Sequence, residues 1–303
     1  MTLPELLRRA VFVTGPTSVG KSTVALAWAR ECGGEIVCAD AFQLYRELSV
    51  LSAQPGNDER DGVPHHLYGC LPCAEEIDAA RYAEMARTVL SDIVSRGKTP
   101  IVVGGSGLYL QALISGLPTL PAIAPALRGE VRAMTLEAMI ARMRELDPDS
   151  LAVIDVNNPR RVARRLELCL QTGRPASRVL PDLSATPSGL RGVFFTRIRE
   201  DLFARIAAAV ALRLEGGAVE EVEAVRNMAG CTARQILGWR EITALLDGVI
   251  TMEECRERLV VATRKYAKRQ LTWFRGKSTF PEEDISAVTP DTLERIAHRL
   301  GLT

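Results

Sequence analysis

Residues 10–23 read Ala-Val-Phe-Val-Thr-Gly-Pro-Thr-Ser-Val-Gly-Lys-Ser-Thr, a short apolar run that leads into a glycine-rich turn. The apolar run predicts a buried strand, and the residues from Thr23 to Arg30 predict a helix. A turn of this kind directs backbone N–H groups, the positive end of the helix and a lysine ammonium at one anion. It predicts a phosphate or diphosphate site, with the Ser22 hydroxyl placed to hold Mg²⁺. The residues of this site are Gly15, Pro16, Thr17, Ser18, Val19, Gly20, Lys21 and Ser22.

Strands and helices alternate along the chain outward from this loop. Further strands are expected at residues 35–39, 100–103 and 192–196, and further helices at 77–95, from 108 to 114, and at 158–173. The alternation predicts an α/β fold, a P-loop NTPase-like parallel sheet flanked by helices, with a small helical insertion lobe and a helical C-terminal region. We expect the first part of the core at residues 1–120, the lobe at 121–155, and the rest of the core with the C-terminal helices at 156–303.

Composition and charge exclude several classes of protein. Of 303 residues, 47% are hydrophobic and 25% charged, which rules out collagen-like, low-complexity and disordered chains. Lys plus Arg number 38 against 37 for Asp plus Glu, so any basic surface must be local. Seven irregularly spaced cysteines favour free thiols in a reducing compartment. Glycines and prolines interrupt the long uncharged stretch at 99–127, so we expect no membrane span, a cytoplasmic location and, without a heptad repeat, a monomer.

One acidic residue, Asp40, closes the second expected strand, at the edge where open α/β sheets bind ligands. An ordinary ATPase also needs a Walker-B carboxylate after a neighbouring strand, but the third strand ends in Val103-Gly104-Gly105. Asp40 therefore suits either a Mg²⁺ ligand or a general base. The glycine-rich turn that follows, Gly104–Tyr109, fits a close approach to a ligand and a plain tight turn equally well.

Two basic clusters stand out against the neutral total. The expected helix at 158–173 carries four arginines on its polar side, and the stretch 259–281 contains six basic residues and no acid. Tyr266, Trp273 and Phe274 interleave with the second cluster. Basic clusters of this kind are often only the solvent-exposed side of a helix. Two acid-poor clusters together favour a surface that binds the phosphate backbone of a nucleic acid.

Taken in order, these motifs resemble the tRNA dimethylallyltransferases, also called tRNA isopentenyltransferases, of bacterial type. The resemblance extends over nearly the whole chain. Its most specific parts are Asp40-Ala-Phe-Gln-Leu-Tyr45, Gly104-Gly-Ser-Gly-Leu-Tyr109 and Tyr266-Ala-Lys-Arg-Gln-Leu-Thr-Trp-Phe-Arg275. The family's usual Asp-Ser is Asp40-Ala41 here, and its usual Gly-Tyr is Gly238-Trp239.

The resemblance implies an activity and a partner. It implies transfer of a dimethylallyl group from dimethylallyl diphosphate to the exocyclic amine of the adenosine at tRNA position 37, with Mg²⁺ as cofactor and the anticodon stem-loop as partner. It implies catalytic roles for Asp40 as general base, for Thr17, and for Arg199 as a cation on the diphosphate. The tRNA-binding residues that it implies are Asp40, Ala41, Phe42, Gln43, Ser106, Arg128, Arg160, Arg161, Val162, Ala163, Arg164, Lys268, Arg269 and Arg275.

Two other functions fit parts of the pattern. A small-molecule or nucleotide kinase would use the same loop with ATP, although the missing Walker-B acid argues against it. A non-catalytic RNA-binding module would bind tRNA in a salt-dependent way and transfer nothing.

Overall fold

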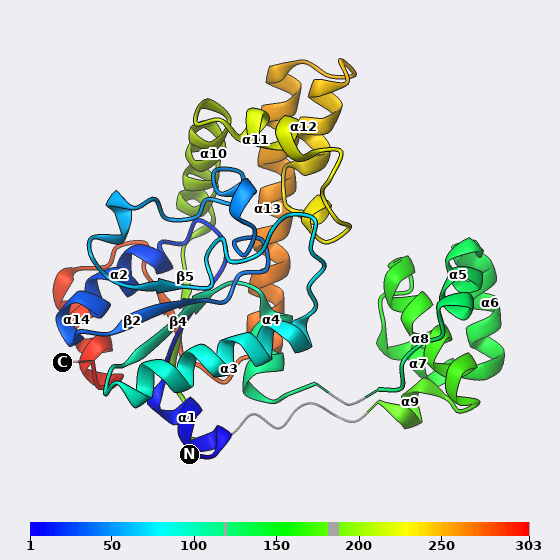
Figure 1. The fold of residues 1–303 in the computed structure, drawn as a ribbon, viewed down its shortest axis with the longest axis horizontal. Coiled ribbons are helices and arrows are strands. Elements are labelled where there is room, and N and C mark those ends of the chain that lie inside the picture. The colour runs from blue at the N-terminus through cyan, green and yellow to red at the C-terminus, as the bar shows by residue number, and fades with distance from the viewer. Residues whose placement is uncertain (118–119, 181–187, 303) are drawn as a thin grey trace. The chain divides into compact units, whose positions relative to one another are not determined.

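The computed structural model describes residues 1–117, 120–180 and 188–302, which form two compact units (Figure 1). Unit 1 comprises Met1–Gly116 and Thr186–Thr303, and unit 2 comprises Leu117–Ala185. Within the described ranges, none of the helices combines the length and the apolar character that crossing a membrane requires.

Unit 1 is built on a six-stranded sheet in which every strand pair is parallel, in the order β3-β2-β4-β1-β5-β6. The strands are β1 (Val11–Thr14), β2 (Glu35–Cys38), β3 (His65–His66), β4 (Pro100–Gly104), β5 (Arg191–Thr196) and β6 (Glu282–Asp284). The predicted fold class and the four predicted strands are confirmed. Strands β3 and β6 escaped prediction because two or three residues are too few to show a strand period.

The α-helices of unit 1 are α1 (Leu3–Arg9), α2 (Lys21–Cys32), α3 (Ala79–Ser95), α4 (Gly107–Ile114), α10 (Arg199–Glu215), α11 (Ala218–Val225), α12 (Trp239–Leu246), α13 (Met252–Lys277) and α14 (Pro290–Arg299). Of these, α2 and α3 pack against the strands, whereas α11 packs on α10 and α12 packs on α13. Trp28 of α2 and Ile296 of α14 share one core with Val11 and Val13 of β1. Tyr82 of α3 donates a hydrogen bond from its hydroxyl to the carbonyl of Cys38, which fixes that helix against β2.

The parallel sheet decides where the predicted motifs meet. Because all its strands run in one direction, the loops that follow β2, β4 and β1 leave from the same edge. Those loops carry Asp40, the turn Gly104–Gly107 and the phosphate loop Gly15–Ser22, in that spatial order. The fold thus places the three segments side by side at the carboxyl edge of the sheet.

Unit 2 is a small helical bundle with its own core. Its helices are α5 (Pro125–Ala133), α6 (Leu136–Leu146), α7 (Pro148–Val153), α8 (Pro159–Thr172) and α9 (Ala176–Val179). The core includes Val131, Met143, Val162 and Leu166. The unit is longer than the expected lobe at 121–155, because the apolar stripe of α8 packs against α5 and α6. The boundary expected at 155–156 therefore falls inside this bundle.

Candidate active site

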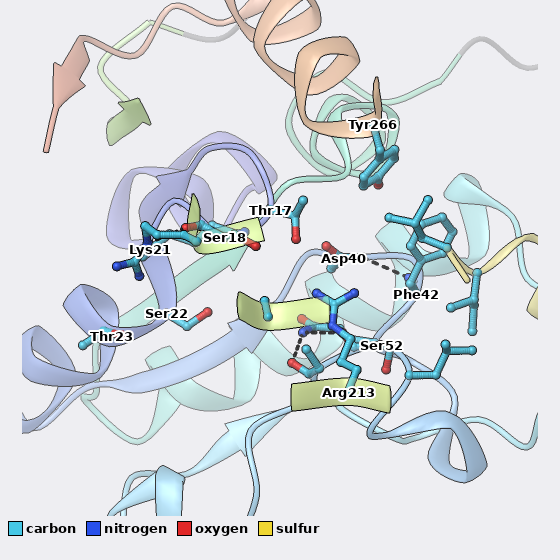
Figure 2. Close-up of a pocket in the computed structure, with 18 residues that line it drawn as sticks. Thr17, Ser18, Lys21, Ser22, Thr23, Asp40, Phe42, Ser52, Arg213 and Tyr266 are labelled. Carbon is cyan, nitrogen blue, oxygen red and sulfur yellow. Dashed lines mark hydrogen bonds between the residues drawn. The ribbon is translucent and has the colours of Figure 1, made fainter. Parts of the chain in front are cut away.

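A cavity of about 220 Å³ lies at the carboxyl edge of the sheet, between the phosphate loop and the loop that follows β2 (Figure 2). Its lining combines the N-terminus of α2 with parts of α10 and α13. The charged residues among those that line it are Lys21, Asp40, Arg205 and Arg213. Three cations against one anion make this a cavity suited to a negatively charged ligand.

The phosphate loop has the backbone that the sequence predicts. Gly20 adopts φ +104° directly before α2, and a Cβ at Gly15 would lie 2.7 Å from the carbonyl oxygen of Phe195, so both positions favour glycine. Lys21 donates a hydrogen bond from Nζ to the carbonyl of Pro16 at 3.2 Å. Burial lowers the pKa of Lys21, and the negative charge of Asp40 opposes that shift. The predicted loop residues and Asp40 therefore act on one another electrostatically.

Asp40 is held in place by the chain around it. Its side chain is only 9% exposed, and its Oδ1 accepts a hydrogen bond from the backbone N–H of Phe42 at 3.0 Å. The Ser106 hydroxyl accepts a hydrogen bond from the N–H of Ala41 at 2.9 Å, which fixes the same loop from the β4 side. Within the described residues Asp40 forms no ion pair, so the carboxylate keeps acceptor capacity toward the cavity.

The turn after β4 is glycine-rich because other parts of the protein approach it closely. A Cβ at Gly104 would lie 2.0 Å from the carbonyl oxygen of Ala39, and one at Gly107 would lie 2.3 Å from the ring of Trp273. Gly105 would meet the amide of Gln270 at the same distance of 2.3 Å. Close packing within the protein is thus a third reason for these glycines, besides the ligand approach and the plain tight turn that the sequence allows.

Gln270, for which no role is predicted from the sequence, bridges the phosphate loop and this turn. Its Oε1 accepts a hydrogen bond from the N–H of Thr17 at 2.9 Å, and its Nε2 donates one to the carbonyl of Gly105 at 2.9 Å. Gln270 is 5% exposed and belongs to α13. A neutral amide in the middle of a basic stretch is the signal that could have revealed this role.

Aromatic side chains form another wall of the cavity. Phe42 and Tyr266 both line it, and their ring centroids are 5.4 Å apart. Gln43 lines it as well, but its Nε2 donates to the carbonyls of Ser52 and Ala53 at 3.2 and 2.6 Å. The amide nitrogen of Gln43, one of the expected tRNA-binding residues, is thus already used within the protein.

The arginines at the cavity are not the one that was expected. Arg199 is exposed, is absent from the lining, and has its guanidinium 5.0 Å from the centroid of the Phe203 ring. Arg205 and Arg213, further along α10, line the cavity instead. Arg205 donates from Nε to the carbonyl of Ser18 at 2.9 Å. The spacing of eight residues, which keeps two side chains on one side of a helix, is the signal that could have found this pair.

The expected tRNA-binding residues of α13 are all exposed to solvent, but they differ in whether another side chain already pairs with them. Lys268 and Arg269 are exposed, and the guanidinium of Arg269 lies 5.5 Å from the ring centroid of Tyr266. Arg275 is also exposed but forms a two-bond ion pair with Glu282 of β6. Lys268 and Arg269 are therefore the more available of the three for phosphate contacts.

In unit 2 the expected tRNA-binding residues divide between surface and core. Arg128, Arg161 and Arg164 are exposed, as is Arg160, while Ala163 is partly buried. Val162 is fully buried in the core of this unit, because it lies on the apolar stripe of α8. The assignment of Val162 to tRNA contact is wrong for its side chain.

The oxygen donors at the cavity fit a magnesium ion. The hydroxyl-bearing residues Ser22 and Thr23 line the cavity at the start of α2, and the carboxylate of Asp40 faces it. Hard oxygen donors of this kind, completed by phosphate oxygens and water, are those that Mg²⁺ takes. Among the described residues, no three His, Cys, Asp or Glu side chains cluster into a metal site of their own.

Comparisons with known proteins converge on one family. A family model described as IPP transferase matches residues 43–277. The chain is 40% identical to the tRNA dimethylallyltransferase of Parvibaculum lavamentivorans, over 94% of this chain and 96% of that relative, and 40% identical to that of Rhodopseudomonas palustris, over 97% and 95%.

Solved structures agree in fold with these relatives. The tRNA isopentenylpyrophosphate transferase of Bacillus halodurans is similar with a TM-score of 0.71 and 31% identity, covering 97% of this chain and 96% of that one. A eukaryotic dimethylallyltransferase acting on tRNA is similar with a TM-score of 0.76 and 26% identity, covering 95% and 77%.

Proposed function

The chain belongs to the IPP transferase family, and from this premise we propose that it transfers a dimethylallyl group from dimethylallyl diphosphate to a tRNA. We propose further that the acceptor is the exocyclic amine of the adenosine directly 3′ of the anticodon, at position 37. The observation that carries the proposal is the shared cavity: a phosphate loop and a buried carboxylate face the same space. A transferase needs both, one for the leaving group and one for the nucleophile.

The phosphate loop would hold the donor by its diphosphate. Backbone N–H groups at the start of α2 and the ammonium of Lys21 face the cavity, and both favour a group that gains negative charge as it leaves. The Thr17 N–H is bonded to Gln270, so for Thr17 the hydroxyl, not the N–H, is the group left for the donor. Bound Mg²⁺, held through the Ser22 hydroxyl, would neutralise part of the diphosphate charge.

Asp40 would act as the general base. An adenine amine is a weak nucleophile because its lone pair is delocalised into the ring. As the new carbon–nitrogen bond forms and the allylic carbon–oxygen bond breaks, the amine loses a proton, and the carboxylate of Asp40 is the acceptor at hand. Diphosphate leaves with the electron pair of the broken bond. The target base must leave its stack to reach this enclosed position.

The exposed basic residues would hold the tRNA. Lys268 and Arg269 on α13, and Arg160, Arg161 and Arg164 on α8, are exposed and suited to phosphate contacts. They supply affinity without reading sequence, whereas the choice of base is left to the cavity walls, Phe42 and Tyr266 among them.

A transfer assay tests the proposal directly. The protein is incubated with Mg²⁺, labelled dimethylallyl diphosphate and an unmodified anticodon stem-loop, and the RNA is then digested and analysed by mass. We expect one isoprenoid unit on the adenosine 3′ of the anticodon. ATP turnover without label in the RNA would favour a kinase, and salt-dependent RNA binding without transfer would favour a binding module; either result contradicts the proposal.

A further inference from the structure

Arg213 is the charged residue at the cavity that the mechanism above leaves unused. It lies near the end of α10, its side chain is 9% exposed, and it lines the cavity together with Lys21 and Asp40. Figure 2 shows its guanidinium directed from the helix toward the side of the cavity where Asp40 lies. It also lines a second, more open cavity of about 670 Å³ that shares Ala53 and Ala209 with the first.

The guanidinium of Arg213 lacks the partners that a structural arginine has. Its Nε is buried and has no hydrogen-bond partner in the described part of the chain, and Arg213 takes part in no ion pair there. By contrast, Arg197, which lies just before α10, donates a hydrogen bond to the carbonyl of Val19 and forms an ion pair with Asp201. A buried, unpaired cation is costly to the folded protein, so its presence calls for a compensating ligand.

The charges around Arg213 indicate what that ligand is. Asp40 attracts the guanidinium but forms no ion pair with it among the described residues, and one oxygen of Asp40 already accepts the N–H of Phe42. Lys21 adds a second positive charge to the lining of the same cavity. Two cations, Arg213 buried and Lys21 partly buried, line one cavity with a single carboxylate and leave a net positive charge for an anion to neutralise.

We propose that Arg213 binds the diphosphate of the donor, in the role that the sequence suggested for Arg199. The five N–H groups of a guanidinium match the oxygens of a phosphate group and can form two parallel hydrogen bonds with it. Arg213 would thereby stabilise the charge that develops on the leaving group opposite the phosphate loop. The assignment rests on the proposed function, because it takes the cavity to be the donor site.

Binding of inorganic diphosphate to the full-length protein tests this assignment without turnover. Calorimetry is carried out with Mg²⁺ on wild type, Arg213→Met and Arg213→Lys, with dimethylallyl diphosphate and ATP titrated alongside. We expect Arg213→Met to bind both diphosphate and the donor about 10- to 100-fold more weakly, because a charge-assisted hydrogen bond is lost. We expect Arg213→Lys to recover part of the affinity, since it keeps the charge but not the fork. A loss confined to ATP would overturn the assignment.

The melting temperature of the ligand-free protein separates binding from folding. Methionine fills the space of the arginine stem and removes an unpaired buried charge, so Arg213→Met should melt about 2–4 °C higher than wild type. Diphosphate affinity within twofold of wild type would overturn the assignment. So would weaker binding accompanied by a lower melting temperature, which would make Arg213 a structural residue.

Three comparison variants make the result specific. Arg199→Met tests the competing arginine directly, and a larger loss of diphosphate affinity there than in Arg213→Met would contradict our assignment. Arg226→Met, which removes a partly exposed arginine paired with Asp247, controls for the substitution itself. Lys21→Ala tests the cavity: if it and Arg213→Met both bind diphosphate normally, the proposed donor site fails, whereas normal binding by Arg213→Met alone removes only Arg213.

Discussion

At the scale of single residues, the chemistry depends on a carboxylate whose position is fixed by backbone contacts. Asp40 follows β2, accepts the N–H of Phe42, and belongs to a loop tied to Ser106. Such fixing orients the base toward the cavity without an ion pair that would compete for its oxygens. The environment of Asp40 thus suits proton transfer better than a purely structural role.

Removal of this carboxylate should abolish most of the transfer and little of the binding. For Asp40→Asn we expect turnover to fall about 10²- to 10⁴-fold, the usual contribution of a positioned general base. The anticodon stem-loop should bind with nearly unchanged affinity, since the amide has the same shape. Single-turnover transfer and RNA binding by filter assay provide the two measurements. Turnover near the wild-type level would remove Asp40 from the mechanism.

At the scale of secondary-structure elements, α13 connects the surface of unit 1 to its active site. Lys268 and Arg269 face solvent on this helix, while Gln270, the next residue, is buried and bonded to both glycine-rich loops. A single helix thereby carries candidate tRNA contacts and the amide that fixes the phosphate loop. The helix ends where Arg275 pairs with Glu282 of β6, which anchors it to the sheet.

Gln270 should therefore affect donor binding although it touches no reacting atom. In Gln270→Ala the Thr17 N–H and the Gly105 carbonyl lose their partner, which should cost about 1–3 kcal/mol of stability. We expect the KM for dimethylallyl diphosphate to rise about tenfold, with a smaller change in kcat. Thr272→Ala, on the exposed side of the same helix, should change neither. An unchanged KM in a folded Gln270→Ala protein would exclude this positioning role.

The carboxylate of Glu35, on β2 next to β3, should make the stability of the folded protein depend on pH. Glu35 on β2 accepts hydrogen bonds from Arg96, which mainly lowers its pKa to about 2, and it also contacts Nε2 of His66 at 2.7 Å. Its pKa in the unfolded chain is about 4.3. The stabilisation by Glu35 is hence complete above the unfolded pKa and is lost as the pH falls through about 2.

Substitution of this carboxylate should make that dependence visible. At pH 6, Glu35→Gln should unfold at a lower urea concentration than wild type. Its free energy of unfolding should be lower by about 1–3 kcal/mol, after allowance for the partly exposed Arg96. The difference between the two proteins should shrink as the pH is lowered from 4.5 toward 2. Urea unfolding at several pH values measures it, and a difference independent of pH would contradict the linkage.

At the scale of the whole molecule, the donor site lies within unit 1, whereas the expected tRNA contacts are divided between unit 1 and unit 2. All residues that line the cavity belong to unit 1, whereas Arg128 and the arginines of α8 belong to unit 2. Unit 2 has its own core, so a surface substitution there leaves the cavity intact. Binding of the two substrates should accordingly respond to different substitutions.

Arg164→Ala tests this division of roles. Arg164 is exposed and only loosely paired with Glu167, at 3.4 Å, so its charge is available to an RNA phosphate. We expect weaker binding of the anticodon stem-loop and a salt slope reduced by about one, with donor affinity unchanged. Arg142→Ala, which removes an exposed arginine paired with Glu145 in the same unit, serves as the control. An unaltered salt slope in Arg164→Ala would count against a phosphate contact.

Local sequence determined the elements and the chemistry of this protein. The phosphate loop, Asp40 and the four longer strands could be predicted because each depends on residues within one turn or one strand of one another. The cap of α8 was equally local, since Asn158 accepts the N–H groups of Arg160 and Arg161. The burial of the Val162 side chain could not be predicted for the converse reason: it depends on helices that lie elsewhere in the sequence.

Only the tertiary structure decided which distant residues complete the site. Gln270 reaches Thr17 across more than two hundred residues, and Arg213 rather than Arg199 faces the cavity because the direction of α10 from β5 carries its later turns, not its first, past the phosphate loop. Packing also placed α8 in unit 2, although its sequence pattern fits a core helix as well. Sequence patterns report short-range periodicity and turn chemistry, whereas the meeting of remote segments depends on how whole elements pack.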